Sequence, residues 1–117
     1  MEREAATSAP IFEVKADMFR ALGHPARVRA LEILSDGEQS VGELAGQVGL
    51  EASHLSQQLG ILRRAGLVTT RKEGSTVFYA IRDPQLVELL AVAKRLLISS
   101  LTHTRELLAG LEADARG

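Results

Sequence analysis

The chain of 117 residues contains no cysteine. This excludes disulfide bridges, thiolate metal sites, iron–sulfur clusters and thiol-based redox sensing. Long apolar runs are also missing: the uninterrupted apolar stretches span a few residues, whereas a membrane-spanning helix needs about 20. The first ten residues lack the apolar segment of a secretory signal. We therefore expect a cytoplasmic protein with no membrane partner.

Apolar residues make up 45% of the chain and charged residues 25%, which is the balance of a globular protein with one ordinary core. We expect a disordered tail at residues 1–10. A single winged helix-turn-helix domain for DNA binding and dimerisation is expected over residues 11–111, and a C-terminal tail over 112–117.

Charge is distributed unevenly along a chain whose net charge is only −1. Residues 1–52 carry five bases and nine acids, whereas residues 53–82 carry five bases and a single acid. Clustered lysine and arginine release counterions from phosphates, so the basic segment predicts a local contact with a polyanion. An ordinary solvated surface is the alternative.

Helical spacing of apolar residues begins at Ile11 and predicts a first helix that ends near Gly23. Pro25 suits the first position of a second helix, which we expect to end at Asp36-Gly37. Together these segments predict two helices before the centre of the chain.

Ser40 and Glu43 have the S-x-x-E spacing of a capping box, which predicts the start of a third helix. Gly49 ends that helix, and apolar spacing predicts a fourth over about residues 52–65. Two short helices around a glycine-containing turn are typical of a helix-turn-helix.

After Gly66 the apolar period changes from about 3.6 to 2. Residues 67–72 and 76–81 are rich in strand-forming side chains and are separated by Glu73-Gly74-Ser75, which predicts a β-hairpin. A helix-turn-helix followed by a hairpin is a winged helix. The expected fold is mostly α with a small hairpin wing, in the order four helices, two strands and a last helix.

The last helix is expected over residues 84–111, a length of about 42 Å. Its apolar side chains form a stripe along this whole length, and a domain this small cannot cover such a stripe. A two-fold homodimer built from the first and last helices is the simplest solution; folding back or fraying at the C-terminal end is the alternative. The predicted interface residues are Ile11, Val14, Met18, Leu86, Leu90, Ala93, Leu97, Leu101 and Leu108.

In a winged helix the second helix of the pair enters the major groove and the hairpin follows flanking phosphates. Glutamine can pair with adenine and arginine with guanine, while serine adapts to either. Basic and hydroxyl side chains on the hairpin suit phosphate contacts. The predicted DNA-binding residues are Ser53, His54, Ser56, Gln57, Gln58, Arg63 and Arg64 on the helix, and Arg71, Lys72, Ser75 and Thr76 on the hairpin.

Four landmarks resemble the ArsR/SmtB family of bacterial winged-helix transcriptional repressors. They are A-L-x-x-P-x-R-x-x-x-L-x-x-L at Ala21–Leu34, S-V-G-E-L-A at Ser40–Ala45, S-x-x-L-x-x-L-R-x-A-G-L-V at Ser56–Val68 and R-x-E-G-x-x-V-x-Y at Arg71–Tyr79. The resemblance implies a homodimer that binds a palindromic operator in double-stranded DNA. It also implies a response to an effector or to a protein co-regulator.

The chain departs from this family at both of its usual metal sites. No cysteine occurs near Ser40, where many members carry one, and the last-helix site keeps Asp83 but has Gln85, Leu96 and Ser99 at the other positions. Gln58 replaces the usual histidine of the recognition helix, which leaves the preferred operator open.

No cofactor and no catalytic site are predicted, because the chain has no G-x-S-x-G turn, phosphate-binding glycine loop or H-E-x-x-H helix. Two alternatives to a repressor without a metal remain. One is a nickel- or zinc-like metal effector held by His24 with Asp17, or by His103 with acidic residues such as Glu106 that a dimer brings near it. The other is a dimeric helical adaptor that binds no DNA.

Overall fold

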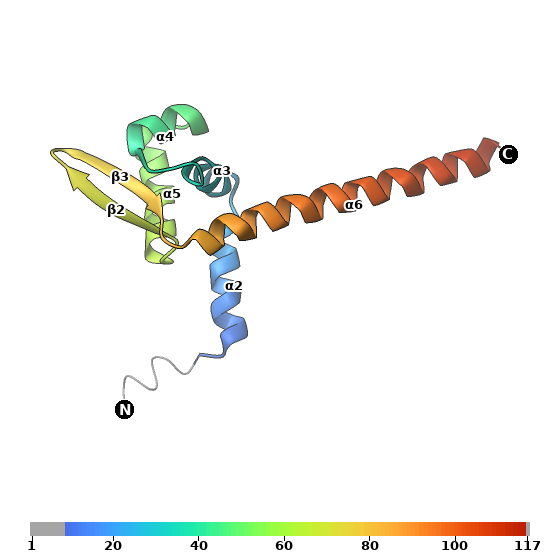
Figure 1. The fold of residues 1–117 in the computed structure, drawn as a ribbon, viewed down its shortest axis with the longest axis horizontal. Coiled ribbons are helices and arrows are strands. Elements are labelled where there is room, and N and C mark those ends of the chain that lie inside the picture. The colour runs from blue at the N-terminus through green and yellow to red at the C-terminus, as the bar shows by residue number, and fades with distance from the viewer. Residues whose placement is uncertain (1–8, 117) are drawn as a thin grey trace. The chain divides into compact units, whose positions relative to one another are not determined.

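The computed structural model describes residues 9–116, and Figure 1 shows short helices beside a small sheet, followed by one long helix. The chain forms two compact units, one up to Pro84 and one from Gln85 onward. In chain order the described elements are α2 (Ile11–Leu22), α3 (Pro25–Leu34), β1 (Gln39–Ser40), α4 (Val41–Val48), α5 (Ala52–Arg64), β2 (Val68–Glu73), β3 (Thr76–Ile81) and α6 (Pro84–Arg116). This is the predicted winged helix-turn-helix.

Helices α4 and α5 form the helix-turn-helix. The predicted capping box is present: the Ser40 hydroxyl accepts from the Glu43 N–H at 3.2 Å, and the Glu43 carboxylate accepts from the Ser40 N–H at 3.1 Å. Gly49 ends α4 at a φ of 83°, a left-handed conformation that glycine adopts without a steric penalty. The core side of α5 consists of leucines that are fully buried: Leu55, Leu59 and Leu62.

The wing is an antiparallel hairpin of β2 and β3, with Glu73 opposite Thr76 at its tip. A third strand, β1, pairs with β3 in the order β1-β3-β2. No pattern in the sequence predicts β1, because two residues are too few to show a period. Ser40 lies in β1 and is also the N-cap of α4, so the sheet joins the wing directly to the helix-turn-helix.

Arg27 on α3 holds the first helix and the recognition helix together. Its Nε donates to the carbonyl of Ala21 at 2.6 Å and its Nη2 to the carbonyl of Arg20 at 3.2 Å, both in the last turn of α2. Its Nη1 donates to the side-chain oxygen of Gln58 on α5 at 2.7 Å. One guanidinium therefore caps α2 and fixes a side chain of α5.

Helix α6 has 33 residues and a length of about 50 Å. It continues to Arg116, so residues 112–116, which the sequence analysis assigned to a tail, are helical. Gly117 and most of the predicted tail at 1–10 lie outside the described residues, and Ala9 and Pro10 precede α2 without being helical. Within residues 9–116 no helix has the length and apolar character that crossing a membrane requires.

Candidate nucleic-acid interface

The outer face of α5 carries the polar side chains that the sequence predicted for base contact. The buried leucines occupy one side of the helix, so the residues between them point away from the core. The exposed members of the predicted set are Ser53, His54, Ser56, Gln57, Arg63 and Arg64.

Gln58 differs from its neighbours because it is only half-exposed and is bound to Arg27. A bidentate contact to adenine needs the side-chain oxygen as acceptor and the amide nitrogen as donor. That oxygen already accepts from Arg27, which holds the Gln58 side chain against α3 and makes it less available for this contact. Gln57 beside it is exposed.

A cleft of about 450 Å³ lies between the starts of α4 and α5 and the tip of the wing. It brings together three hydroxyl residues that were predicted separately as DNA contacts, Ser56, Ser75 and Thr76. The rest of its wall consists of Ser40, Val41, Gly42 and Val77, which were not predicted. Hydroxyl groups and backbone N–H groups at a helix start are typical phosphate ligands.

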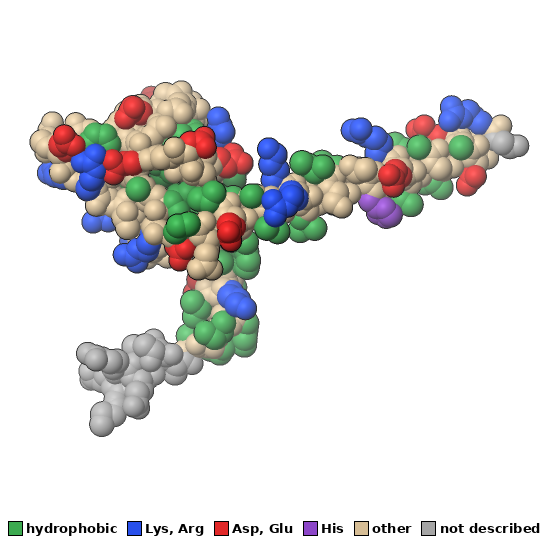
Figure 2. Space-filling view, viewed as in Figure 1, with side chains coloured by type: hydrophobic (Ala, Val, Ile, Leu, Met, Phe, Trp, Pro, Cys, Tyr) green, Lys and Arg blue, Asp and Glu red, His purple; other side chains and the backbone are tan. Residues whose placement is uncertain are grey.

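Arg71 is held by carboxylates instead of projecting freely from the wing. Its Nε and Nη2 donate to Glu38 at 2.7–2.9 Å, and its Nη1 donates to Glu73 at 2.7 Å. The guanidinium also lies over the Phe78 ring, 4.4 Å from its centroid. Figure 2 shows acidic and basic side chains side by side over the hairpin.

These hydrogen bonds hold the pKa of the Glu38 carboxyl below its usual value and raise the pKa of Arg71, so both groups stay charged. With two carboxylates on one guanidinium, the cluster has no positive charge left for a phosphate. The expected phosphate contact by Arg71 therefore has no support in the structure, and the residue anchors the wing to the loop before β1. Lys72 next to it is exposed, and among residues 9–116 no ion pair of its ammonium group is seen.

Large apolar side chains remain exposed along α2 and α6, as Figure 2 shows. Leu101 is 66% exposed. Leu86 differs from the other predicted interface residues named on α6, because it is only 6% exposed within the single chain. The exposed large apolar residues are Ile11, Phe12, Val14, Phe19, Val92, Leu96, Leu97, Ile98, Leu101, Leu107, Leu108 and Leu111.

These exposed side chains include five of the predicted interface residues and are more numerous on each helix than predicted. The prediction took only the residues at regular three- and four-residue spacing on each helix. It therefore missed exposed apolar residues beside them, which are Phe12 on α2 and Leu96 and Leu107 on α6. Exposed apolar area of this extent on a small protein indicates a protein–protein contact.

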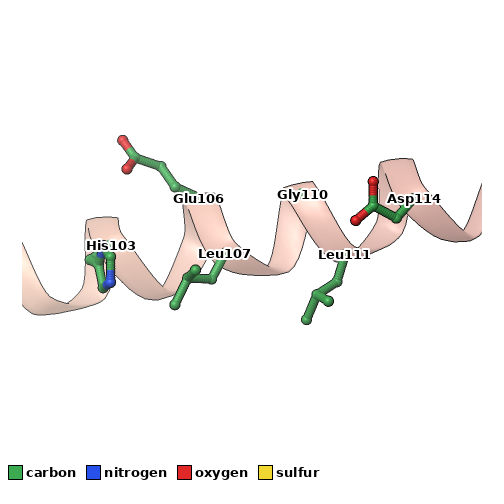
Figure 3. Close-up of a pocket in the computed structure, with 6 residues that line it drawn as sticks. All are labelled: His103, Glu106, Leu107, Gly110, Leu111 and Asp114. Carbon is green, nitrogen blue, oxygen red and sulfur yellow. The ribbon is translucent and has the colours of Figure 1, made fainter.

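The histidines do not gather metal ligands. The Nδ1 atom of His24 accepts from the Ala26 N–H at 3.1 Å, and Asp17 pairs with Arg20. Figure 3 shows that His103 and Glu106 project differently from α6 and do not converge on a common point. Across the part of the chain that the structure describes, no group of three His, Cys, Asp or Glu side chains is placed to hold a metal ion.

The helix-turn-helix, the hairpin beside it and the polar outer face of α5 define a winged helix-turn-helix regulatory protein. Residues 24–70 match the family described as bacterial regulatory protein, arsR family. The uncharacterized HTH-type transcriptional regulator Rv0081 of Mycobacterium tuberculosis is 49% identical over 107 residues, which cover 91% of this chain and 94% of that protein. Its crystal structure has a TM-score of 0.75 at 50% identity, covering 81% of this chain and 96% of that one. The chain belongs to the ArsR family of transcriptional regulators.

Other relatives include one that is named a repressor and one that is named an activator. The biofilm growth-associated repressor of Agrobacterium fabrum is 41% identical over 75 residues, 64% of each chain. The transcriptional activator HlyU of Vibrio cholerae is 42% identical over 79 residues, 68% of this chain and 73% of that one. The solution structure of the homodimeric winged helix-turn-helix DNA-binding domain Mb0332 of Mycobacterium bovis has a TM-score of 0.73 at 28% identity, covering 88% of this chain and 92% of that one. These relatives are regulators and not enzymes.

Proposed function

We propose that this protein is a homodimeric repressor that binds a palindromic operator and that works in the cytoplasm, where the bacterial chromosome lies. In this proposal residues 11–111 act as one DNA-binding and dimerisation domain. The apolar faces of α2 and α6 join two copies, and each copy presents one α5 to the major groove. Half-sites one helical turn of DNA apart then give the operator the two-fold symmetry of the protein.

The observation that carries this proposal is that the exposed polar face of α5 borders the hydroxyl-lined cleft at the tip of the wing, with Ser56 belonging to both. Gln57 and the serines of α5 are exposed for base edges, and the cleft formed by Ser56, Ser75 and Thr76 lies beside them for a phosphate. Base-reading and phosphate-positioning groups therefore occur together, as sequence-specific binding requires. Repression is proposed because the four sequence landmarks resemble a family of repressors; the names of the relatives include both a repressor and an activator.

The test is the binding of the purified protein to duplexes from the region upstream of its own transcription unit, followed by fluorescence anisotropy at several salt concentrations. Affinity should fall steeply with salt, because phosphate contacts release counterions. Lys72→Ala should weaken every duplex alike and reduce the slope of log K against log salt by about one.

Arg95→Ala is the matched control, since it removes one positive charge from an exposed position on α6 about 120° around the helix from Leu101, outside the apolar stripe; its slope should equal that of the wild type. A wild-type protein that binds no upstream duplex would refute the proposal. In a reporter strain that carries the operator, production of the protein should lower expression; increased expression would identify an activator instead.

Gln57→Ala should relax the choice of operator and leave binding to unrelated duplexes unchanged. A lost bidentate base contact reduces discrimination at that base pair by about 1–3 kcal/mol. Anisotropy competition with operators changed one base pair at a time measures this loss. Glu51→Ala serves as the control, because Glu51 is exposed just before α5 and is not part of the predicted set. Undiminished discrimination in Gln57→Ala would show that another side chain reads the base.

A further inference from the structure

A second cavity lies in the unit up to Pro84 and shares no lining residue with the predicted DNA contacts. It has a volume of about 390 Å³ and a mostly apolar wall. This is within the range of about 300–1,000 Å³ that small-molecule sites occupy. Its lining residues are His24, Pro25, Ala26, Arg29, Val48 and Leu50.

Two polar side chains interrupt the apolar wall, and both offer hydrogen-bond donors. Arg29 is exposed, and its contact with Glu32 on the same helix is 3.7 Å long, well beyond the 2.7–2.9 Å of a strong charged hydrogen bond. His24 accepts from the Ala26 N–H through Nδ1, so in the neutral ring the proton is on Nε2. The cavity is thus lined by an arginine whose ion pair with Glu32 is long and by a histidine that can donate through Nε2.

We propose that this cavity binds a small monocarboxylate with a compact apolar body. Arginine donors in a fork match the two oxygens of a carboxylate. Val48, Leu50 and Pro25 supply the apolar contact for the rest of the ligand. A dianion or a sugar would leave polar groups unpaired against this wall, which costs binding free energy.

The position of the cavity gives such a ligand access to the turn of the helix-turn-helix. Pro25, Ala26 and Arg29 belong to α3, whereas Val48 is the last residue of α4 and Leu50 lies in the turn that leads to α5. A bound carboxylate therefore contacts both sides of the junction that sets the direction of the recognition helix. This inference does not depend on the proposed operator, because binding is measured on the free protein.

The test uses benzoate, with benzyl alcohol as an uncharged compound of the same shape, titrated into the full-length protein and followed by NMR. Benzoate should shift the amide signals of Ala26, Gly49 and Leu50 in a saturable way, with a dissociation constant of about 1 mM. Benzyl alcohol should bind at least about tenfold more weakly, because it cannot form the charged hydrogen bonds.

Arg29→Met should weaken benzoate at least about tenfold, because the variant keeps an apolar stem but loses the guanidinium. Arg105→Met removes the same charge from an exposed position on α6 and should bind benzoate as the wild type does. The absence of saturation below about 10 mM would overturn the proposal. Equal affinity of Arg29→Met and the wild type would also overturn it, as would shifts confined to other amides.

Discussion

Leu101→Glu is expected to turn the protein into a monomer that loses operator binding. Leu101 is exposed in the single chain and lies on the central apolar stripe of α6. A two-fold interface contains each residue twice, so the substitution removes two leucine contacts of about 1.5–3 kcal/mol each and adds two charges without partners. A monomer loses the gain of about 100-fold or more that comes from joining two half-site readers.

Sedimentation equilibrium would measure the oligomeric state, and anisotropy would measure operator affinity. Thr102→Glu is the control, because Thr102 is exposed and lies about 100° around the helix from Leu101, outside the stripe. It should remain dimeric and bind the operator. A dimeric Leu101→Glu protein with normal operator affinity would show that the interface lies elsewhere.

Arg27→Met should destabilise the protein by about 2–4 kcal/mol, because it removes a charged donor from three acceptors. The two short bonds, to Ala21 and to Gln58, connect α2 and α5 through one half-exposed side chain. Without the guanidinium, the last carbonyls of α2 lose their cap and Gln58 loses the contact that orients it. Urea unfolding followed by circular dichroism measures the loss.

Arg29→Met is the matched control, because Arg29 is exposed on the same helix and makes only the long contact to Glu32. Its stability should stay within about 0.5 kcal/mol of the wild type. Gln58→Met and the double variant Arg27→Met/Gln58→Met complete a double-mutant cycle. We expect this cycle to give an interaction energy of about 1–2 kcal/mol between the two side chains. If Arg27→Met is as stable as Arg29→Met, the guanidinium does not hold the two helices together.

The structure distinguishes two neighbouring glutamines on α5 that share one predicted role. Gln57 and Gln58 are adjacent and chemically identical, so pattern analysis assigned both to base contact. In the structure the side-chain oxygen of Gln58 accepts a hydrogen bond from Arg27, whereas Gln57 is exposed. We therefore expect Gln58→Met to lower stability and Gln57→Ala to lower operator discrimination.

The sequence by itself determined the order of the helices and the hairpin and where most of the helices begin. Helix ends depend on a few neighbouring residues, such as the Ser40–Glu43 capping box, the proline at the start of α3 and Gly49 after α4. The winged helix follows from the change of apolar period after Gly66. The helical end of α6 was missed because residues 112–116 are small and charged and extend no apolar stripe.

Tertiary structure alone decided which polar side chains are free to act. Arg27 meets Gln58 across 31 residues, and Arg71 meets Glu38 across 33 residues. Neither pairing follows from spacing along one helix or strand, because both depend on how separate elements pack. The same packing forms the two-residue strand β1, gathers Ser56, Ser75 and Thr76 in one cleft, and places Arg29 beside Val48 and Leu50. Local patterns therefore specified the fold, and contacts between distant segments decided which polar side chains are held by other residues and which stay exposed.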